Sequence, residues 1–241
     1  MTLQAVVLAA GKGTRLGRPL PKPLTQLADG RSILAQQVDN LRQVLGEQLS
    51  ITAVVGYKAP LIMEALPTLL FAYNEDYEDT NTSKSLLRAL ELSADGPVVW
   101  LNGDVVFEPA LLELLLGPLT RGESAVCVNT ASVAEEEVKY TVDDDGYVKE
   151  LSKTVVGGLG EAVGINLVGA ADKALLIENL RACGDQDYFE RGIELSIAQG
   201  MKVLPVDISA HVAVEVDFEE DLARAERLVA EHRQSQDPQH P

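Results

Sequence analysis

The first strand and the loop after it constrain the fold of this chain more than any other feature. An apolar run at residues 6–10 leads directly into a glycine-rich segment at 11–17 and then into Pro-Lys-Pro-Leu at 21–24. Glycine has no Cβ, so such a loop turns tightly and brings backbone N–H groups close to an anion. The chain carries a net charge of −17, yet two cations, Arg15 and Lys22, accompany this loop. We therefore expect the loop to bind a polyphosphate.

Two other glycine-rich phosphate loops do not fit the spacing. A Walker A loop needs Ser or Thr directly after Gly-Lys, whereas Lys12 is followed by Gly13. A dinucleotide fingerprint needs Gly-x-Gly-x-x-Gly, but its last position is Leu16 and Gly17 comes one residue late. No acidic residue ends a second strand about 20 residues further on, where a ribose ligand would be expected. The spacing thus argues against a P-loop ATPase and a dehydrogenase.

The remaining strand and helix signals alternate along the chain. Apolar β-branched runs predict strands at 3–9, 51–55, 69–73 and 98–101, and helical spacing predicts helices at 33–45, 58–66 and 83–93, the first capped by Ser32. In the second half we expect a hairpin, 138–142 with 147–151, and helices at 170–182, 187–199 and 218–231. This alternation predicts an α/β fold, a Rossmann-like, mostly parallel sheet with helices on both faces, in three layers.

Composition and length limit the organisation and the partners. We expect one domain over residues 1–230 and a polar, disordered tail over 231–241. The net charge of −17 argues against a nucleic-acid partner, because phosphates repel such a surface. No run is apolar enough to span a membrane, and no signal segment is recognisable. The two cysteines, Cys127 and Cys183, lack metal-ligand spacing and are expected to be reduced, as in a cytoplasmic protein.

The first loop resembles the signature of the nucleotidyltransferases, Leu-Ala-Ala-Gly-x-Gly-x-Arg-Leu followed by Pro-Lys-x-Leu. Members of that family move a nucleoside monophosphate from an NTP to a phosphorylated acceptor and release pyrophosphate. Later motifs are most similar to the phosphocholine-type cytidylyltransferase branch. The resemblance implies CTP as nucleotide, Mg²⁺ as cofactor and a small phosphorylated alcohol or a phosphonate as acceptor. It leaves a homodimer open.

The resemblance gives the first loop its roles. Arg15 would hold the β- and γ-phosphates, and Lys22 would reach the α-phosphate during transfer, since both neutralise charge that is redistributed in the transition state. The rest of the loop would position the nucleoside and offer N–H groups to the phosphates: Leu8, Ala9, Ala10, Gly11, Lys12, Gly13 and Thr14. A surface loop with solvated cations would explain any single cation, but the whole ordered set favours phosphate binding.

The carboxyl end of the strand at 98–101 is the expected metal site. Polarity appears abruptly in Asn102-Gly103-Asp104, and ligands of open α/β sheets bind beyond the carboxyl ends of strands. Asp104 suits Mg²⁺, which takes oxygen ligands, and Asn102 and Gly103 would then lie beside the nucleotide. Alternatively, Asp104 only caps a turn before Pro109.

A second carboxylate is expected at residues 215–217, which match the family's Glu-x-Asp. We assign Asp217 to Mg²⁺ and Glu215 to a supporting role. Asp217 also has a structural interpretation, since it precedes a predicted helix and can cap it, with Glu220 completing a capping box.

The polar run at residues 74–86 resembles the base-binding segment of the cytidylyltransferase branch. Asn81 and Ser85 would read the Watson–Crick edge of a pyrimidine, and Gly56, after the second strand, also matches the family. The alternative is helix capping by Asn81 or Thr82, which would explain those residues but not the whole run.

In the back half, residues 150–165 match the acceptor region of that branch. Lys153 would contribute to catalysis by binding the acceptor phosphate, and Glu161 would bind a polar or cationic part of the acceptor. Tyr188, in a recurring segment at 187–190, would contact the acceptor or join the core. Aromatic residues make up only 5% of the chain, and a quaternary ammonium usually needs an aromatic cage. Choline phosphate is therefore not favoured over aminoalkyl phosphonates or polyol phosphates.

Two rival functions remain open at this point. A sugar-1-phosphate nucleotidylyltransferase using UTP, dTTP or GTP shares the first loop and both aspartates, although its loop is usually longer and its base contacts differ. A non-catalytic nucleotide-sensing module would be expected to lose Lys22, Asp104 or Asp217, and this chain has all three. The histidines at 211, 232 and 240 show no metal-ligand spacing and receive no role.

Overall fold

The computed structural model describes residues 2–131, 133 and 137–236. Within them, the main sheet has the strand order β10-β6-β9-β4-β1-β2-β3, and a hairpin, β7–β8, joins it at β9. The strands of this sheet are β1 (Gln4–Ala9), β2 (Ser50–Val55), β3 (Leu70–Tyr73), β4 (Val98–Asn102), β6 (Ser124–Asn129), β7 (Lys139–Val142), β8 (Val148–Ser152), β9 (Glu161–Val168) and β10 (Val203–Asp207). All strands of the main path are parallel except β9, which pairs antiparallel with both β4 and β6.

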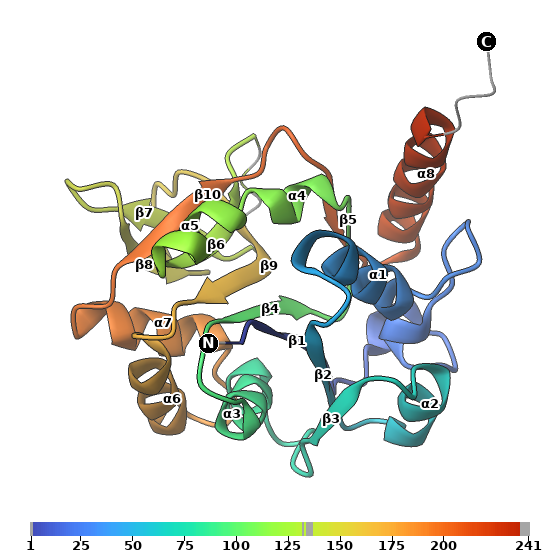
Figure 1. Cartoon of the computed structure of the whole chain (residues 1–241), viewed down its shortest axis with the longest axis horizontal. Helices are drawn as coiled ribbons and strands as arrows, with labels where there is room; N and C mark the ends of the chain where they lie inside the picture. The colour runs from blue at the N-terminus through green and yellow to red at the C-terminus, as the bar shows by residue number, and fades with distance from the viewer. Residues whose placement is uncertain (1, 132, 134–136, 237–241) are drawn as a thin grey trace.

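Helices cover both faces of this sheet, as Figure 1 shows. One apolar core lies between the sheet and α1 (Ile33–Leu45), α2 (Ala59–Ala65), α4 (Ala110–Glu113) and α5 (Leu116–Arg121). A second core lies under α3 (Thr82–Leu92), α6 (Lys173–Ala182) and α7 (Phe189–Ala198). The predicted three-layer α/β fold with a mostly parallel sheet is therefore confirmed.

The first crossover shows why the sequence folds in this way. Leu34, Val38 and Leu41 recur at helical spacing and are all buried on the sheet, as expected for the apolar stripe of an amphipathic helix. Ser32 caps this helix, because its hydroxyl accepts a hydrogen bond from the N–H of Ala35 at 3.1 Å. Both predictions for this segment are confirmed.

A small antiparallel ribbon lies beside the sheet and was not predicted. It consists of β5 (Val105–Phe107) and β11 (Ala213–Glu215). Val214 and Val216 pack against Leu222 and Ala225 of α8 (Glu219–Gln236), which forms a third apolar cluster. The ribbon carries residues 215–217 to the carboxyl end of β4, over one hundred positions away in sequence, and so completes the site described below.

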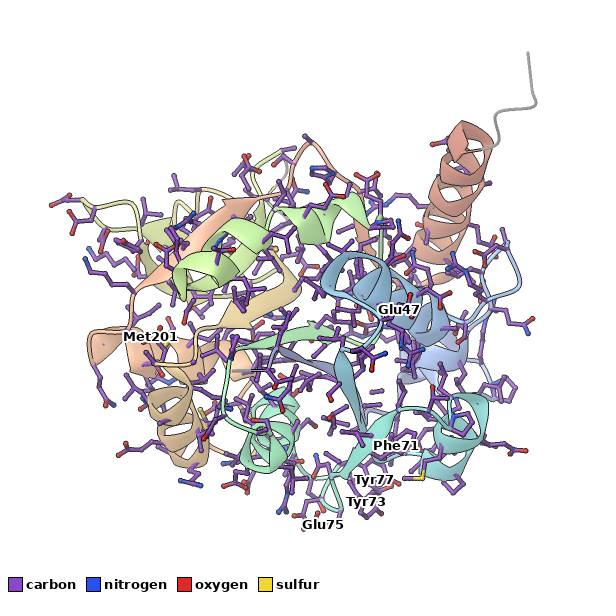
Figure 2. All side chains as sticks on the ribbon, viewed as in Figure 1. Glu47, Phe71, Tyr73, Glu75, Tyr77 and Met201 are labelled. Atoms are coloured by element: carbon purple, nitrogen blue, oxygen red, sulfur yellow. The ribbon has the colours of Figure 1, made fainter. Side chains whose placement is uncertain are left out.

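The edge strand β3 agrees with its predicted range, whereas the last helix is longer than predicted. β3 is an edge strand, and Phe71 and Tyr73 lie along it, with Tyr77 in the loop that follows (Figure 2). Helix α8 continues to Gln236, so residues 231–236 are helical rather than part of a disordered tail. Glu, Arg and Gln in this stretch are good helix formers, and no Gly or Pro ends the helix earlier. The other predicted tail residues, 237–241, lie outside the described residues.

No helix in the described part of the chain has both the length and the apolar character needed to cross a membrane.

Candidate active site

The predicted phosphate loop forms one wall of a cleft of about 990 Å³ at the carboxyl ends of β1 and β4. After β1, the chain makes two short 3₁₀ helices, η1 (Thr14–Leu16) and η2 (Lys22–Leu24). Gly13 has a φ of +55°, and a Cβ at this position would lie 2.6 Å from the Cβ of Lys22. A residue with a side chain would therefore be strained here and would displace Lys22.

Lys22 bridges the two predicted metal ligands. Its Nζ lies 2.7 Å from Oδ2 of Asp104 and 2.6 Å from Oδ1 of Asp217, and its side chain is 8% exposed. Burial lowers the pKa of Lys22, but the two carboxylates outweigh this effect and hold the pKa above its ordinary value. Lys22 is thus a charged ammonium group enclosed between carboxylates.

Arg15 contacts the same aspartate from the solvent side. Its Nη1 lies 2.6 Å from Oδ2 of Asp217. Burial raises the pKa of Asp217, but Lys22 and Arg15 lower it by more. The net pKa is therefore below its ordinary value, and the carboxylate stays ionised. Both cations that sequence analysis assigns to the phosphates therefore reach the predicted metal ligands from the first loop.

The capping role predicted for Asp217 is wrong. Helix α8 begins at Glu219, later than expected, and the carboxylate three residues after Phe218 is Asp221 rather than Glu220. Oδ2 of Asp221 accepts hydrogen bonds from the N–H groups of Asp217 and Phe218, at 3.1 and 2.9 Å. The Asp217 side chain is consequently not needed for the cap and turns to Lys22 and Arg15.

Asp104, Glu215 and Asp217 form a carboxylate cluster, and one oxygen from each lies within 4.8 Å of the others. Oδ1 of Asp104 is buried and has no hydrogen-bond partner among the described residues. Oxygen ligands at this spacing, one of them unsatisfied, fit a hard divalent cation such as Mg²⁺. This cluster includes both predicted metal ligands. Glu215, which was expected only to support them, lies as close to the shared position as the two aspartates.

The charge of Glu215 depends on its neighbours. Desolvation within the cleft and repulsion, first from Asp104 and then from Glu137 and Asp217, raise the pKa of Glu215 above its ordinary value. Because its side chain is exposed to the cleft, water reduces the effect of burial, and repulsion from the neighbouring carboxylates contributes more. Like charges at short range disfavour ionisation, and a bound cation would reverse this effect.

Most of the predicted nucleotide-binding residues line the cleft. These are Leu8, Ala9, Gly11, Gly13, Asn81, Asn102 and Gly103. Gly103 allows a close approach, since a Cβ there would lie 2.6 Å from the carbonyl oxygen of Leu8. Asn102 places a buried Oδ1 without a hydrogen-bond partner in the described chain at this edge.

Other residues of that set lie behind or beside the cleft. Lys12 pairs with Glu78 at 2.8 Å and fastens the first loop to the segment after β3. Ala10 is buried, and its carbonyl accepts a hydrogen bond from the N–H of Tyr57. At Gly56, a Cβ would lie 2.8 Å from that same carbonyl, so this glycine permits two loops to pack closely. Thr14 begins η1.

The two residues predicted to read the base occupy different environments. Asn81 lines the cleft and caps α3, with its Oδ1 accepting a hydrogen bond from the N–H of Thr82 at 2.8 Å. Ser85 lies one turn further along α3, is buried, and accepts a hydrogen bond from Nδ2 of Asn74 at 3.1 Å. Asn81 is thus accessible to a base, whereas Ser85 is buried and holds Asn74 in place by a hydrogen bond.

The predicted acceptor residues line the same cleft, and the part of it around Lys153 and Tyr188 is called the acceptor end below. Lys153, Glu161 and Tyr188 all line it, and Nζ of Lys153 lies 5.2 Å from the centroid of the Tyr188 ring. Tyr188 is 45% exposed and precedes α7, so it is not a core residue. Phe189, directly after it, is the residue that joins the core.

Sequence analysis gave no role to two further groups in the cleft. Glu190, in the first turn of α7, is 8% exposed and lines the acceptor end. Burial raises its pKa to about 7. His211 lies near the ribbon and pairs with Glu108 at 2.6 Å. Glu190 ends the recurring segment at 187–190, from which sequence analysis singled out Tyr188 alone, because a carboxylate in the first turn of a helix is common in any sequence.

The chain is similar to known proteins over most of its length. Residues 5–191 match the MobA-like NTP transferase domain. The chain belongs to this family. A segment of 122 residues, 47% of the chain, is 43% identical to a CMP-5'-(3-aminopropyl)phosphonate synthase from Streptomyces rubellomurinus, and it spans 19% of that relative. Another, of 146 residues and 58% of the chain, is 34% identical to the bifunctional protein GlmU of a Cyanothece species and spans 31% of it.

Solved structures share the fold over almost the whole chain. The inositol-1-phosphate CTP transferase from T. maritima has a TM-score of 0.78 at 16% identity, over 95% of each chain. The CTP:phosphocholine cytidylyltransferase LicC from Streptococcus pneumoniae has a TM-score of 0.72 at 19% identity, over 95% of this chain and all of that one. The predicted nucleotidyltransferase resemblance is therefore confirmed at the level of family and fold.

Proposed function

We propose that this protein is a Mg²⁺-dependent cytidylyltransferase that moves CMP from CTP to a small phosphorylated alcohol or a phosphonate. The observation that carries the proposal is the convergence of Lys22 and Arg15 on a three-carboxylate cluster, directly beneath the glycine loop. Cationic side chains bind phosphates, and carboxylates bind a divalent cation, so a site that holds both can bind a polyphosphate together with its metal ion.

In the proposed reaction, an oxygen of the acceptor phosphate or phosphonate forms a new bond to the α-phosphorus of CTP. The bond from that phosphorus to the bridging oxygen breaks, and pyrophosphate leaves with both electrons of this bond. Lys22 would contact the α-phosphate, Arg15 would hold the leaving group, and Lys153 would orient the acceptor. A Mg²⁺ ion held by Asp104 and Asp217 would neutralise charge on the phosphates. No side-chain nucleophile is needed, because alignment and charge neutralisation lower the barrier.

CTP is favoured over other nucleotides by the names of the relatives. Two structural neighbours are named as CTP-dependent transferases, and one relative is named for a CMP-phosphonate product. A third structural neighbour is named as a putative glucose-1-phosphate thymidylyltransferase from Bacillus anthracis. The match to GlmU keeps a sugar-1-phosphate transferase as the second candidate. Because the matched segments span a minor part of both curated relatives, substrate choice needs its own test.

A pyrophosphate-release screen of four NTPs against phosphate, phosphonate and sugar-1-phosphate acceptors tests the proposal. We expect turnover with CTP and a small phosphate or phosphonate. A preference for UTP, dTTP or GTP with a sugar-1-phosphate would overturn the cytidylyltransferase assignment in favour of a sugar-1-phosphate nucleotidylyltransferase. Tight NTP binding without turnover of any acceptor would indicate a nucleotide-sensing module.

A further inference from the structure

The acceptor end of the cleft contains a buried carboxylate that the proposed reaction does not use. Glu190 is 8% exposed and lines the cleft from the first turn of α7. Its Oε2 is inaccessible to water and has no hydrogen-bond partner within the described residues. A buried polar atom without a partner is costly to the fold, so a group that is absent from the free protein is expected to satisfy it.

The charges around Glu190 indicate the sign of that group. Glu137 and Glu161 line the same cleft, and Glu194 follows on the same helix as Glu190. Glu137 and Glu194 both raise the pKa of Glu190. Lys153 is the cation that lowers it. The Nζ of Lys153 lies over the ring of Tyr188 rather than on the carboxylate. This end of the cleft is therefore short of positive charge and suits a cation on the acceptor.

The aromatic side chains indicate which kind of cation fits. A quaternary ammonium binds to exposed aromatic faces. Here the ring of Tyr188 already carries Lys153, and Phe189 is 1% exposed and packs edge-to-face on Trp100, with 5.7 Å between centroids. Phe218 also lines the cleft and is 55% exposed, but it directly follows Asp217 and so belongs to the carboxylate cluster; no other Phe, Tyr or Trp among the described residues lines the cleft. A primary ammonium has N–H donors instead and can satisfy the unpaired oxygen of Glu190.

We propose that Glu190 binds a primary ammonium group of the acceptor, which is therefore a short aminoalkyl phosphonate or aminoalkyl phosphate. The inference rests on the proposed cytidylyl transfer, because it presumes that the phosphonate lies between Lys153 and the nucleotide. Glu190 is then a specificity residue: it selects the acceptor by the charge at the end remote from the reacting oxygen.

The test compares two acceptors of matched length, 3-aminopropylphosphonate and propylphosphonate, by pyrophosphate release with CTP. Glu190→Gln should lower kcat/KM for the amino acceptor by about 10- to 100-fold, mainly through KM, because it removes a charge-assisted hydrogen bond. Propylphosphonate should be a poor substrate of the wild type and be unaffected by the variant. Glu190→Asp, which keeps the charge, should restore part of the loss.

Glu178→Gln is the matched control, since Glu178 is exposed on the neighbouring helix α6 and lies outside the cleft lining. It should leave both acceptors unchanged. Melting temperatures of all variants show whether the fold is intact.

The outcomes separate this inference from the proposed function. If CTP turns over equally well with both acceptors, or if Glu190→Gln slows both equally, the transferase function stands and the ammonium assignment is overturned. A preference for phosphocholine over the primary amine also overturns it. If no nucleotide releases pyrophosphate with any acceptor, the proposed function itself fails, and the inference fails with it.

Discussion

Replacement of Lys22 by Met tests how the carboxylate cluster is held together. Met has a similar length and keeps apolar contacts beside Gly13, but it removes the ammonium that lies 2.7 Å from Asp104 and 2.6 Å from Asp217. Two carboxylates would then face each other, with Arg15 left on Asp217 alone. We expect this repulsion to destabilise the protein and to create an unusually strong site for a divalent cation.

The structure sets the size of the effect. Removing one partner from a fully buried ion pair costs about 3–5 kcal/mol. The side chains of Asp104 and Asp217 are 22% and 26% exposed, and Arg15 remains, so about 2–3 kcal/mol is expected here. In a chain of this size each kcal/mol lowers Tm by about 2–4 °C, which predicts a loss of roughly 5–10 °C. A divalent cation at 100 times its Kd adds about 2.7 kcal/mol and would offset most of this loss.

The assay is thermal unfolding of wild type and Lys22→Met in EDTA and in a series of Mg²⁺ concentrations, without nucleotide. Mg²⁺ should raise the Tm of the variant more than that of the wild type, in which the cation competes with Lys22. The double variant Lys22→Met/Asp104→Asn is the control and should lose the excess effect of Mg²⁺. Equal shifts in wild type and single variant would refute the idea that Lys22 and the cation share the same carboxylates.

Three further predictions concern separate parts of the cleft. Asp104→Asn should lower pyrophosphate release at least about 100-fold while leaving the far-UV circular dichroism unchanged; near-normal turnover would contradict the metal assignment. Burial raises the pKa of Glu190 from 4.5 to about 7, so wild-type stability should fall relative to Glu190→Gln as the pH rises through that range. In urea unfolding, the free energy of unfolding of Glu190→Gln should exceed that of the wild type by roughly 3 kcal/mol above pH 8 and equal it below pH 4. Parallel pH profiles of the two proteins would show that the carboxylate is not buried. Gly13→Ala should weaken CTP binding in calorimetry more than Gly17→Ala, since both have positive φ but only the first would clash with Lys22; equal effects would exclude the clash.

The sequence was sufficient for those parts of the site that lie in contiguous motifs. The first loop and Asp104 each follow a strand with a clear apolar pattern, and parallel strands necessarily bring their carboxyl ends to one edge. Asp217 was found instead by its resemblance to the family's Glu-x-Asp. The structure accordingly brings Lys22, Asp104 and Asp217 into direct contact. The same local patterns predicted helix α1 and the β7–β8 hairpin correctly.

The features that sequence patterns missed depend on distant contacts. β5 and β11 have three residues each, which is too short for an alternating pattern to be recognised, and each is held by the other. Sequence patterns favoured Asp217 as the cap of α8, whereas the carboxylate that caps the helix is Asp221. Both residues fit the composition of a helix start, and only the position of the first helical residue, Glu219, distinguishes them. Burial of Glu190 arises from the packing of α7 on α3, α6 and β8, to which its neighbours in sequence give no clue.

The antiparallel strand β9 explains how one cleft could hold both substrates of the proposed reaction. In a purely parallel sheet, residues at the start of a strand lie at the edge opposite the nucleotide site. β9 runs the other way, with Leu101 of β4 opposite Ile165, so its first residue, Glu161, emerges beyond the carboxyl end of β4. Gly164, at φ +71°, allows this approach, because a Cβ there would lie 2.6 Å from Nδ2 of Asn102. The reversal of a single strand thus brings Glu161, a proposed acceptor residue, to the edge where the first loop ends, as the proposed in-line transfer between two bound substrates would require.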